Sequence, residues 1–574
     1  MNLKQTLDDI LTDAMRAAGV SEGRAIVKQS QRAEFGHYQA NGIMGAAKKM
    51  KTNPRELADA VVEALGEDAR FTTEIAGPGF INITLSPGFI NDSLAETAAS
   101  DRLGVALQDK QRVIVDYSSP NLAKEMHIGH LRPTTIGDAA VRVLEFLGHE
   151  AIRANHVGDW GAQFGSLLAY MDDLKAKGEN ELSSELKDLE QFYIQASGLF
   201  KNDEAFAKRA REYVVRLQGG DEDCLALWRE FIEESVSHCQ RLYEKMNITL
   251  TEADMMPESM YNDDLNPMVE DLKTQGLLVE DDGAQCVFLE EFRGKDGNIL
   301  PAMIQKSDGG FPYMATDVSA IRHRIQNLNA DAALYCVGVE QQLHLKQVFA
   351  VARAAGYLGD QDWRHLPNGF IQKKGGGRFK TRTGGNVKLE EIIDEGIERA
   401  RKLVEEKNPE LSEAEKDNIA RVVGVGAIKY AELSKNRTTD YTFDWDVMLS
   451  FEGNTAPYLQ YAYTRIQSIF RRAGVDRSAL PGIIAPTETA ELALAVKLLQ
   501  FPEAISTMTE DWQANVICGY LFELAGQFMT FYEACPILSA DDTTRDNRLQ
   551  LAGVTARTLA LGLDLLGIET VEQM

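Results

Sequence analysis

Short apolar segments alternate with longer segments of helical periodicity between about residue 110 and residue 390. The apolar segments read "RVIVDY", "EAIRANHV", "AALYCVGV" and "PNGFIQ". Strands that are joined through helices return to the same edge of a sheet and pair in parallel. The alternation therefore predicts a parallel sheet covered by helices, which is an α/β fold.

Three regions differ in pattern, as expected of 574 residues, because a single hydrophobic core does not grow to this size. Residues 1–105 open with helices and end in "EIAGPGFINITLSPGF", where alternation from Phe80 onward indicates a strand, so we expect an α+β domain. Residues 106–390 hold the sheet, with a helical insertion at about 170–250 that is rich in Leu, Ala, Glu and Lys. Residues 391–574 carry almost no strand pattern and are expected to form an all-α domain.

Composition disfavours several classes of protein. No run approaches the roughly 18 apolar residues of a membrane span, and the N-terminus lacks the features of a secretory signal. The six cysteines are scattered without a CxxC pair, which argues against a zinc site or a disulfide framework and favours a cytoplasmic protein. The net charge of −27 favours a metabolic enzyme, and any nucleic-acid partner must meet a local basic face.

Two histidines, His127 and His130, lie where the first apolar strand gives way to a helical pattern that Gly148 ends. Open α/β sheets bind ligands at this carboxyl edge, and a helix N-terminus there offers N–H groups to a phosphate. The spacing puts both imidazoles on one face, and Gly129 between them lets a base or a ribose approach the backbone. Two other interpretations stay open here: the histidines only cap the helix, or they bind a metal, although no third ligand is in register.

The motif "HIGH" at 127–130, after a strand and before a helix, resembles the signature of class I aminoacyl-tRNA synthetases. Longer blocks resemble arginyl-tRNA synthetases in particular: "EFGHYQANG" (34–42), "VDYSSPNLAKEMHIGHLRPTTIGDA", "RANHVGDWGAQFG" (153–165), "LSKNRTTDYTFDWD" (433–446) and "FEGNTAPYLQYAYTR" (451–465). The resemblance implies a Rossmann-like catalytic domain, an N-terminal domain that contacts the tRNA elbow and a C-terminal anticodon-binding domain. It also implies a ligase that adenylates L-arginine with ATP and Mg²⁺, without zinc, and transfers the arginine to the 3′ end of tRNA(Arg).

The resemblance assigns ATP binding to His127, Gly129 and His130, with both histidines stabilising the charge that develops at the α-phosphate. The family's mobile KMSKS loop, which holds pyrophosphate, corresponds here to "RFKTR" between two glycine-rich stretches. Within it, Arg378 and Lys380 are implied to bind ATP.

Lys380 and Arg382 are also implied to be catalytic, but the loop departs from the family pattern. Thr381 stands where the second lysine is usual. In arginyl enzymes with such a loop, a lysine just before HIGH is thought to substitute, and Lys124 matches it. We therefore expect Lys124 to be catalytic as well.

Arginine recognition requires carboxylates with planar, two-pronged geometry. Tyr313 and Asp317 are four residues apart and share one face if their segment is helical. The resemblance carries arginine contacts onto Asp116, Ser119, Asn121, His130, Tyr313, Asp317 and Gln341.

The C-terminal segment "YAYTRIQSIFRRAG" combines Arg465, Arg471 and Arg472 with Tyr461 and Tyr463, a basic and aromatic pattern that is suited to RNA. We expect a monomer. Two alternatives are a non-catalytic RNA-binding paralogue, favoured by the altered loop and the acidic charge, and another nucleotidyltransferase that uses HxGH. The intact histidines argue against the first, and the two flanking domains argue against the second.

Overall fold

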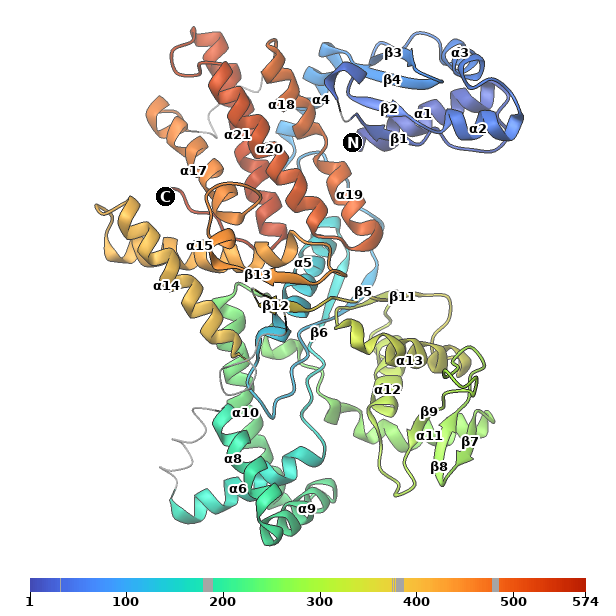
Figure 1. The fold of residues 1–574 in the computed structure, drawn as a ribbon, viewed down its shortest axis with the longest axis vertical. Helices are drawn as coiled ribbons and strands as arrows, with labels where there is room; N and C mark the ends of the chain where they lie inside the picture. The colour runs from blue at the N-terminus through green and yellow to red at the C-terminus, as the bar shows by residue number, and fades with distance from the viewer. Residues whose placement is uncertain (31, 179–188, 374, 376, 378–386, 477–484) are drawn as a thin grey trace.

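The computed structural model describes all residues except 31, 179–188, 374, 376, 378–386 and 477–484. The molecule is elongated (Figure 1). The N-terminal domain and the C-terminal helices lie at one end, the central sheet in the middle, and the inserted helices at the other end.

The central sheet has four parallel strands in the order β11 (Asp362–His365), β10 (Ala332–Tyr335), β5 (Arg112–Asp116) and β6 (Glu150–Ala154). Three of the four predicted segments therefore form this sheet.

The fourth predicted segment, "PNGFIQ", leads into β12 (Ile371–Lys373), which pairs with β13 (Tyr441–Phe443) in a separate two-stranded sheet. The expectation that it joins the central sheet is wrong. The true fourth strand, β11, is an edge strand in which only Trp363 is buried, so its apolar pattern is too weak to detect.

The two faces of the sheet belong to different hydrophobic cores. Side chains alternate along a strand, so Val113 and Val115 of β5 point to one face and Ile114 to the other. The valines pack in a core that extends into the C-terminal helices, whereas Ile114 packs in the core of the helices after the insertion. The two central strands, β5 and β10, are therefore buried on both faces, whereas the edge strands β6 and β11 are only partly buried.

The predicted insertion is helical and has its own core. Its helices are α6 (Ala162–Lys177), α8 (Leu189–Asn202), α9 (Glu204–Gln218) and α10 (Glu222–Lys245). The chain then forms α11 (Asn262–Thr274), the antiparallel sheet β7 (Leu278–Asp281), β8 (Ala284–Val287) and β9 (Ala302–Gln305), and the sheet-covering helices α12 (Tyr313–Gln326) and α13 (Gln342–Ala354).

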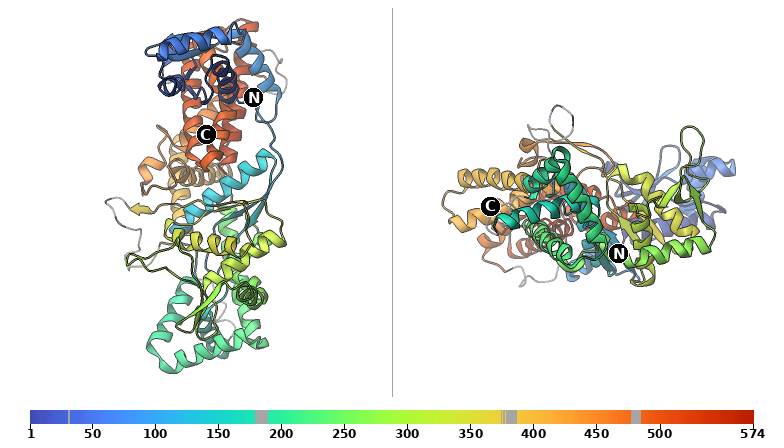
Figure 2. Two further views of the ribbon diagram at one scale, coloured as in Figure 1. Left: turned by 90° about the vertical axis from the view of Figure 1, so that its right-hand side faces the viewer. Right: turned by 90° about the horizontal axis from the view of Figure 1, so that it is seen from below.

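The N-terminal domain is α+β, as predicted. It has an antiparallel sheet in the order β1-β2-β4-β3 and four helices, of which α1 and α3 pack on the sheet. Its elements are α1 (Leu3–Ala17), β1 (Val27–Gln29), β2 (Tyr38–Ala40), α2 (Ile43–Met50), α3 (Pro54–Leu65), β3 (Phe71–Ala76), β4 (Phe80–Leu85) and α4 (Pro87–Ala99). The domain lies beside the C-terminal helices (Figure 2), which α1 and α4 contact.

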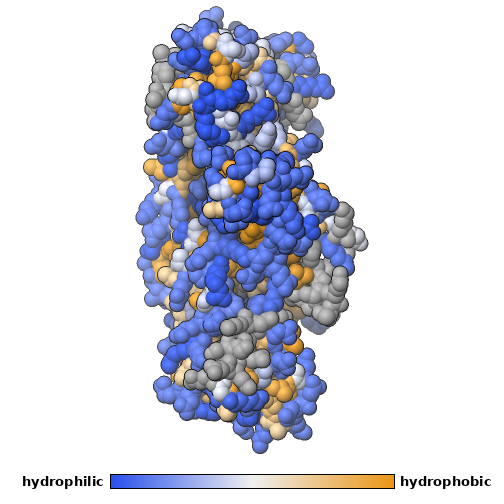
Figure 3. All heavy atoms as spheres, turned by 90° about the vertical axis from the view of Figure 1, so that its left-hand side faces the viewer, coloured by the Kyte–Doolittle hydropathy of each residue, from blue (hydrophilic) through white to orange (hydrophobic). Residues whose placement is uncertain are grey.

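The C-terminal region is helical apart from β13. Its helices are α14 (Leu389–Lys407), α15 (Glu413–Leu433), α16 (Trp445–Met448), α17 (Ala456–Ala473), α18 (Thr489–Leu499), α19 (Phe501–Asp511), α20 (Asn515–Ala534) and α21 (Asp542–Leu565). In the part of the chain that the structure describes, every helix is too short or too polar to span a bilayer. Figure 3 shows a mostly hydrophilic face on which apolar residues form small, scattered groups.

Candidate active site

The two predicted histidines lie side by side at a short 3₁₀ turn, η2 (Ile128–His130), which His127 caps and which lies between β5 and helix α5 (Leu131–Leu147). Their ring centroids are 4.1 Å apart. The backbone N–H of His127 donates to Nδ1 of His130 (3.0 Å), and the N–H of Gly129 donates to Nδ1 of His127 (3.0 Å). Because each Nδ1 accepts a hydrogen bond, each neutral ring carries its proton on Nε2. We refer to residues 127–130 as the HIGH turn.

Both imidazoles of the HIGH turn are neutral at pH 7. Burial lowers the pKa of His130 to about 3, and the neighbouring His127 adds to this effect. Burial, together with the nearby Lys124 ammonium, also lowers the pKa of His127. The turn therefore offers two oriented N–H donors without a fixed positive charge.

The residues that follow the glycine-rich loop pair with the HIGH turn. The N–H of Ile128 donates to the carbonyl of Val387 (3.0 Å), and that of Leu389 donates to the carbonyl of Met126 (2.9 Å). The loop therefore ends against this turn. Its predicted site residues Arg378, Lys380 and Arg382, as well as Thr381, lie outside the described residues.

Lys124 is exposed, and its Nζ lies 4.3 Å from the ring centroid of Tyr193 on α8 of the insertion. This is a cation–π contact. The ammonium is also close enough to His127 to lower the pKa of that imidazole. Lys124 therefore lies next to the HIGH turn.

A tight turn follows β5 and carries two of the predicted arginine contacts. Ser118 and Ser119 have φ angles of 65° and 46°, in the left-handed region that residues other than glycine rarely adopt. Asn155 stabilises this conformation because its Oδ1 accepts the N–H of Ser119 (3.0 Å). Asn121 ends the turn, and its Oδ1 accepts the N–H of Ala123 (3.0 Å).

Asp116, at the end of β5, is buried and engaged by the protein itself. One oxygen accepts from Arg324 (2.7 Å) and the other from the hydroxyl of Ser119 (3.1 Å). Arg324 is itself buried, so the two groups form an internal ion pair. Asp116 therefore fixes the position of Ser119.

Asp317 lies between two histidines. Its Oδ1 is 3.4 Å from Nε2 of His156, and its Oδ2 is 2.5 Å from Nε2 of His344. Burial alone would raise the pKa of Asp317, but the hydrogen bonds from the two histidines outweigh it and hold that pKa well below its usual range. Burial would lower the pKa of His156, yet the contact with Asp317 raises it.

The remaining predicted residues border Asp317. Tyr313 is the first residue of α12, one turn before Asp317, so the two share a helix face as the spacing predicts. Its side chain is exposed. Gln341 ends the 3₁₀ helix η5 (Val339–Gln341) after β10, just before His344, and is also exposed.

Sequence reasoning missed Glu258, which begins the 3₁₀ helix η4 (Glu258–Tyr261). Burial raises the pKa of Glu258 to about 7, with Asp317 and Asp159 adding repulsion and His156 opposing it. Burial raises the pKa of Tyr313, and the charge of Glu258 raises it further. No motif marks this residue or His344, whereas His156 stands inside the block "RANHVGDWG". We refer to Glu258, Asp317, His156 and His344 as the carboxylate cluster.

The site thus combines a cluster that suits a cationic substrate with neutral donors at a helix N-terminus that suit a phosphate. Both belong to segments that connect to the central parallel sheet. Among the described residues, no three His, Cys, Asp or Glu side chains are grouped to hold a metal ion. A parallel sheet with a HIGH turn at its carboxyl edge, followed by a helical domain, defines a class I aminoacyl-tRNA synthetase.

Comparisons with known proteins identify the family within this class. Residues 93–445 match the catalytic domain of class I tRNA synthetases (R), residues 459–574 the DALR anticodon binding domain, and residues 1–85 the arginyl tRNA synthetase N terminal domain. The chain belongs to the arginyl-tRNA synthetase family.

Full-length relatives agree. The chain is 54% identical to the arginine–tRNA ligase of Marinomonas sp. (strain MWYL1) and 52% identical to that of Hahella chejuensis, with 100% of each chain covered. The solved arginyl-tRNA synthetase of Plasmodium falciparum has a TM-score of 0.87 at 29% identity, covering 100% of this chain and 99% of that one. The Thermus thermophilus arginyl-tRNA synthetase, at 24% identity with full coverage of both chains, shares the fold with a TM-score of 0.84.

Proposed function

We infer that this site is that of an arginine–tRNA ligase, which activates L-arginine with ATP and transfers it to the 3′ end of tRNA(Arg). Family membership along the whole chain supports the activity. The residue roles rest on the geometry of the site, and one observation carries them. Asp317 is a carboxylate that stays charged, and its helix α12 covers the same sheet from which the HIGH turn extends.

The carboxylate cluster is the guanidinium site in this proposal. Asp317 is charged at neutral pH, and Glu258 beside it adds a second carboxylate. Two carboxylates can receive the fork of N–H groups on a guanidinium. Tyr313 and Gln341 border the substrate from the exposed side.

The turn after β5 holds the amino-acid end of arginine. Ser119 and Asn121 present polar groups there, and His130 lies at the start of α5. Asp116 acts through Ser119 in this arrangement, because it is buried and already paired with the guanidinium of Arg324.

ATP binds at the HIGH turn, where Gly129 allows close approach to the backbone. An oxygen of the arginine carboxylate attacks the α-phosphorus, the bond to the bridging oxygen of the β-phosphate breaks, and pyrophosphate leaves with that electron pair. The Nε2–H groups of His127 and His130 stabilise the charge that develops on the phosphorus oxygens. ATP enters as its Mg²⁺ complex.

In the second step a hydroxyl of the terminal tRNA ribose attacks the arginyl carbonyl carbon, and AMP leaves. The C-terminal helical domain binds the anticodon, and the N-terminal domain contacts the tRNA elbow. The protein acts as a cytoplasmic monomer.

Pyrophosphate exchange with ATP tests the proposal. We expect exchange that depends on arginine and is near background without tRNA, because Thr381 stands where the clamp's second lysine is usual and binding energy from tRNA is needed to complete the site. Lys124→Ala should abolish exchange even with tRNA present, and Lys380→Ala should cause a smaller loss.

The same assay separates the alternatives. A non-catalytic paralogue gives no exchange under any condition, and another nucleotidyltransferase gives exchange that ignores arginine. Robust exchange in the absence of tRNA would refute the incomplete clamp but not arginine activation.

A further inference from the structure

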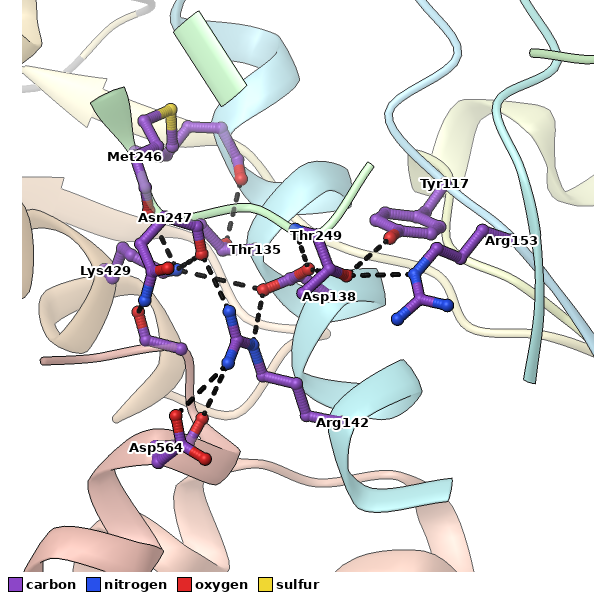
Figure 4. A network of polar contacts seen from close by, with 12 residues as sticks. Tyr117, Thr135, Asp138, Arg142, Arg153, Met246, Asn247, Thr249, Lys429 and Asp564 are labelled. Atoms are coloured by element: carbon purple, nitrogen blue, oxygen red, sulfur yellow. Dashed lines mark hydrogen bonds and ion pairs between the residues drawn. The ribbon is translucent and has the colours of Figure 1, made fainter. Parts of the chain in front are cut away.

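A buried polar network joins α5, the segment 246–249 and the C-terminal helices (Figure 4). Lys429 of α15 is fully buried, and its Nζ donates to the carbonyls of Met246 (3.0 Å) and Asn247 (3.1 Å). Nζ also lies 3.9 Å from Oδ2 of Asp138 on α5. A buried ammonium is tolerated only where acceptors surround it, so this lysine is built into the junction.

Arg142 of α5 contacts the same segment from the other side. Its Nε donates to Asp138 (2.9 Å), and its NH2 group donates to the carbonyl of Asn247 (3.0 Å). It also contacts Asp564 of α21 (3.3 Å). Asn247 has a φ of 52°, in the left-handed region that asparagine adopts more readily than most residues, and both cations bind its carbonyl there. Figure 4 shows Lys429 and Arg142 converging on this residue.

From this junction, one path leads to the turn after β5. The second oxygen of Asp138 accepts both the N–H (2.7 Å) and the hydroxyl (2.6 Å) of Thr249. The hydroxyl of Thr249 accepts from Arg153 of β6 (3.1 Å) and lies 3.5 Å from the hydroxyl of Tyr117. Tyr117 immediately precedes the strained pair of serines.

A second path runs through α10. The hydroxyl of Tyr243, three residues before Met246, lies 2.7 Å from Oγ of Ser118 and accepts from Nδ2 of Asn155 (3.2 Å). The segment that Lys429 holds is therefore flanked by two residues that contact the turn directly. Movement of this segment would move both contacts.

The HIGH turn is tied to the C-terminal helices through different residues. Arg132, two residues after His130, forms a buried ion pair with Glu432 of α15 (2.6 Å). Its NH1 group donates to the carbonyl of Thr439 (2.8 Å). The ATP end of the site therefore has its own support.

We propose that Lys429, a residue of the C-terminal helical region, is a positioning residue for arginine: it holds residues 246–247 on α5 and thereby fixes the 117–121 turn that binds the amino acid. The inference rests on the proposed function, because it assumes that this turn contacts arginine. It gives α15, which lies near the end of the catalytic-domain match at residues 93–445, a role in the activation step.

The first test is Lys429→Met in the full-length enzyme, assayed by pyrophosphate exchange with tRNA present. Methionine keeps much of the length and loses the donors. The KM for arginine should rise about tenfold, as for the loss of hydrogen bonds from a charged donor, while that for ATP stays within about twofold. Lys416→Met is the matched control: this lysine is also largely buried on α15, but pairs with Glu413 (3.1 Å), and both constants should stay unchanged.

A second variant guards against a folding defect. Thr249→Val keeps the shape of the side chain and removes the hydroxyl that links Asp138, Arg153 and Tyr117. It should give the same selective rise in the KM for arginine. Because both changes act on one path, the double variant should be less than additive.

Equal rises in the KM values for arginine and ATP, or a lowered Tm with unchanged KM values, would overturn the proposal and leave Lys429 a purely structural residue. Failure of the proposed function is distinguishable, because the unmodified enzyme would then show no arginine-dependent exchange. If the unmodified enzyme is active and Thr249→Val leaves the KM for arginine unchanged, the positioning path alone is refuted.

Discussion

The two halves of the site use opposite kinds of chemistry. The half proposed to bind arginine contains carboxylates that the protein already pairs: Asp317 with His156 and His344, and Asp116 with Arg324. The half proposed to bind ATP presents neutral imidazoles whose orientation comes from backbone N–H groups. The difference matches what each half has to recognise.

Arginine carries its positive charge before, during and after the reaction, so a fixed negative charge is the appropriate way to select it. At the α-phosphate, extra charge develops only in the transition state. A fixed cation would bind ATP in the ground state as well and give less acceleration, whereas a neutral, oriented donor gains most when the charge appears. The largest effects on rate should therefore come from the HIGH turn, and the largest effects on KM from the carboxylate cluster.

Removing either histidine gives the largest expected effect. His130→Ala and His127→Ala should each lower the rate of activation roughly 100-fold or more, because each removes a transition-state donor. The KM for arginine should change little. Single-turnover formation of the adenylate measures the rate directly.

His149→Ala is the matched control for that experiment. This histidine follows α5, bonds to Gln108 (3.1 Å) and lies away from the site, so its loss should leave the rate unchanged. Full activity in both HIGH-turn variants would show that the transition-state charge is stabilised elsewhere.

The next largest effect is expected at Asp317. Asp317→Asn removes the charge that we propose faces the guanidinium, and the KM for arginine should rise roughly 10- to 100-fold, equivalent to about 1.5 to 3 kcal/mol. The KM for ATP should stay nearly unchanged. Asp308→Asn, at an exposed turn where the carboxylate caps Gly310, is the control. A rise in the KM for ATP instead would assign Asp317 to the nucleotide.

Glu258→Gln should have a smaller effect. Because the pKa of Glu258 is raised to about 7, only about half of the carboxyl groups are charged at neutral pH. The loss of this charge should raise the KM for arginine by roughly threefold at pH 7. A loss as large as that of Asp317→Asn would mean that Glu258 is fully charged and contacts the guanidinium directly.

The two halves also differ in how much of each could be predicted from the sequence. The HIGH turn is local: a strand, a glycine between two histidines and a helical pattern occupy one stretch of chain, so the element and its position at the sheet edge were predictable. The arginine half is assembled from distant segments. Tyr313 and Asp317 were predicted to share a helix face, and α12 confirms it.

The partners of Asp317 could not be predicted from spacing. His156 follows β6, His344 lies in α13 and Glu258 begins η4, and only the packing of the sheet brings them together. The edge strand β11 was missed for a related reason, since its neighbours rather than its own pattern make it a strand. Lys429 was missed because nothing in the sequence distinguishes a buried lysine from an exposed one.

The smallest expected effect, pH dependence, separates the halves without any substitution. As the pH rises from 6 to 8.5, Glu258 loses its proton near its raised pKa of about 7, and His156 loses its proton through its own raised pKa. Both changes make the carboxylate cluster more negative, so the KM for arginine should fall by roughly a few-fold.

The KM for ATP should show no such trend, because the pKa of His130 is lowered to about 3 and that of His127 also lies below its usual value.

In the enzyme without substrate, the loss of protons from His156 and Glu258 has the opposite consequence: it lowers the stability of the fold as the pH rises. The ion pair of His156 stabilises the fold below the unfolded pKa of about 6.5, and this contribution is lost as the pH rises through the raised folded value. Glu258 adds to the loss, since above its unfolded pKa it is the unfolded chain that ionises more readily. Added arginine should therefore raise the Tm more at pH 8.5 than at pH 6, and Glu258→Gln should remove part of that difference. A KM for arginine that stays flat over this range, with a flat Tm response, would mean that neither group titrates beside the substrate.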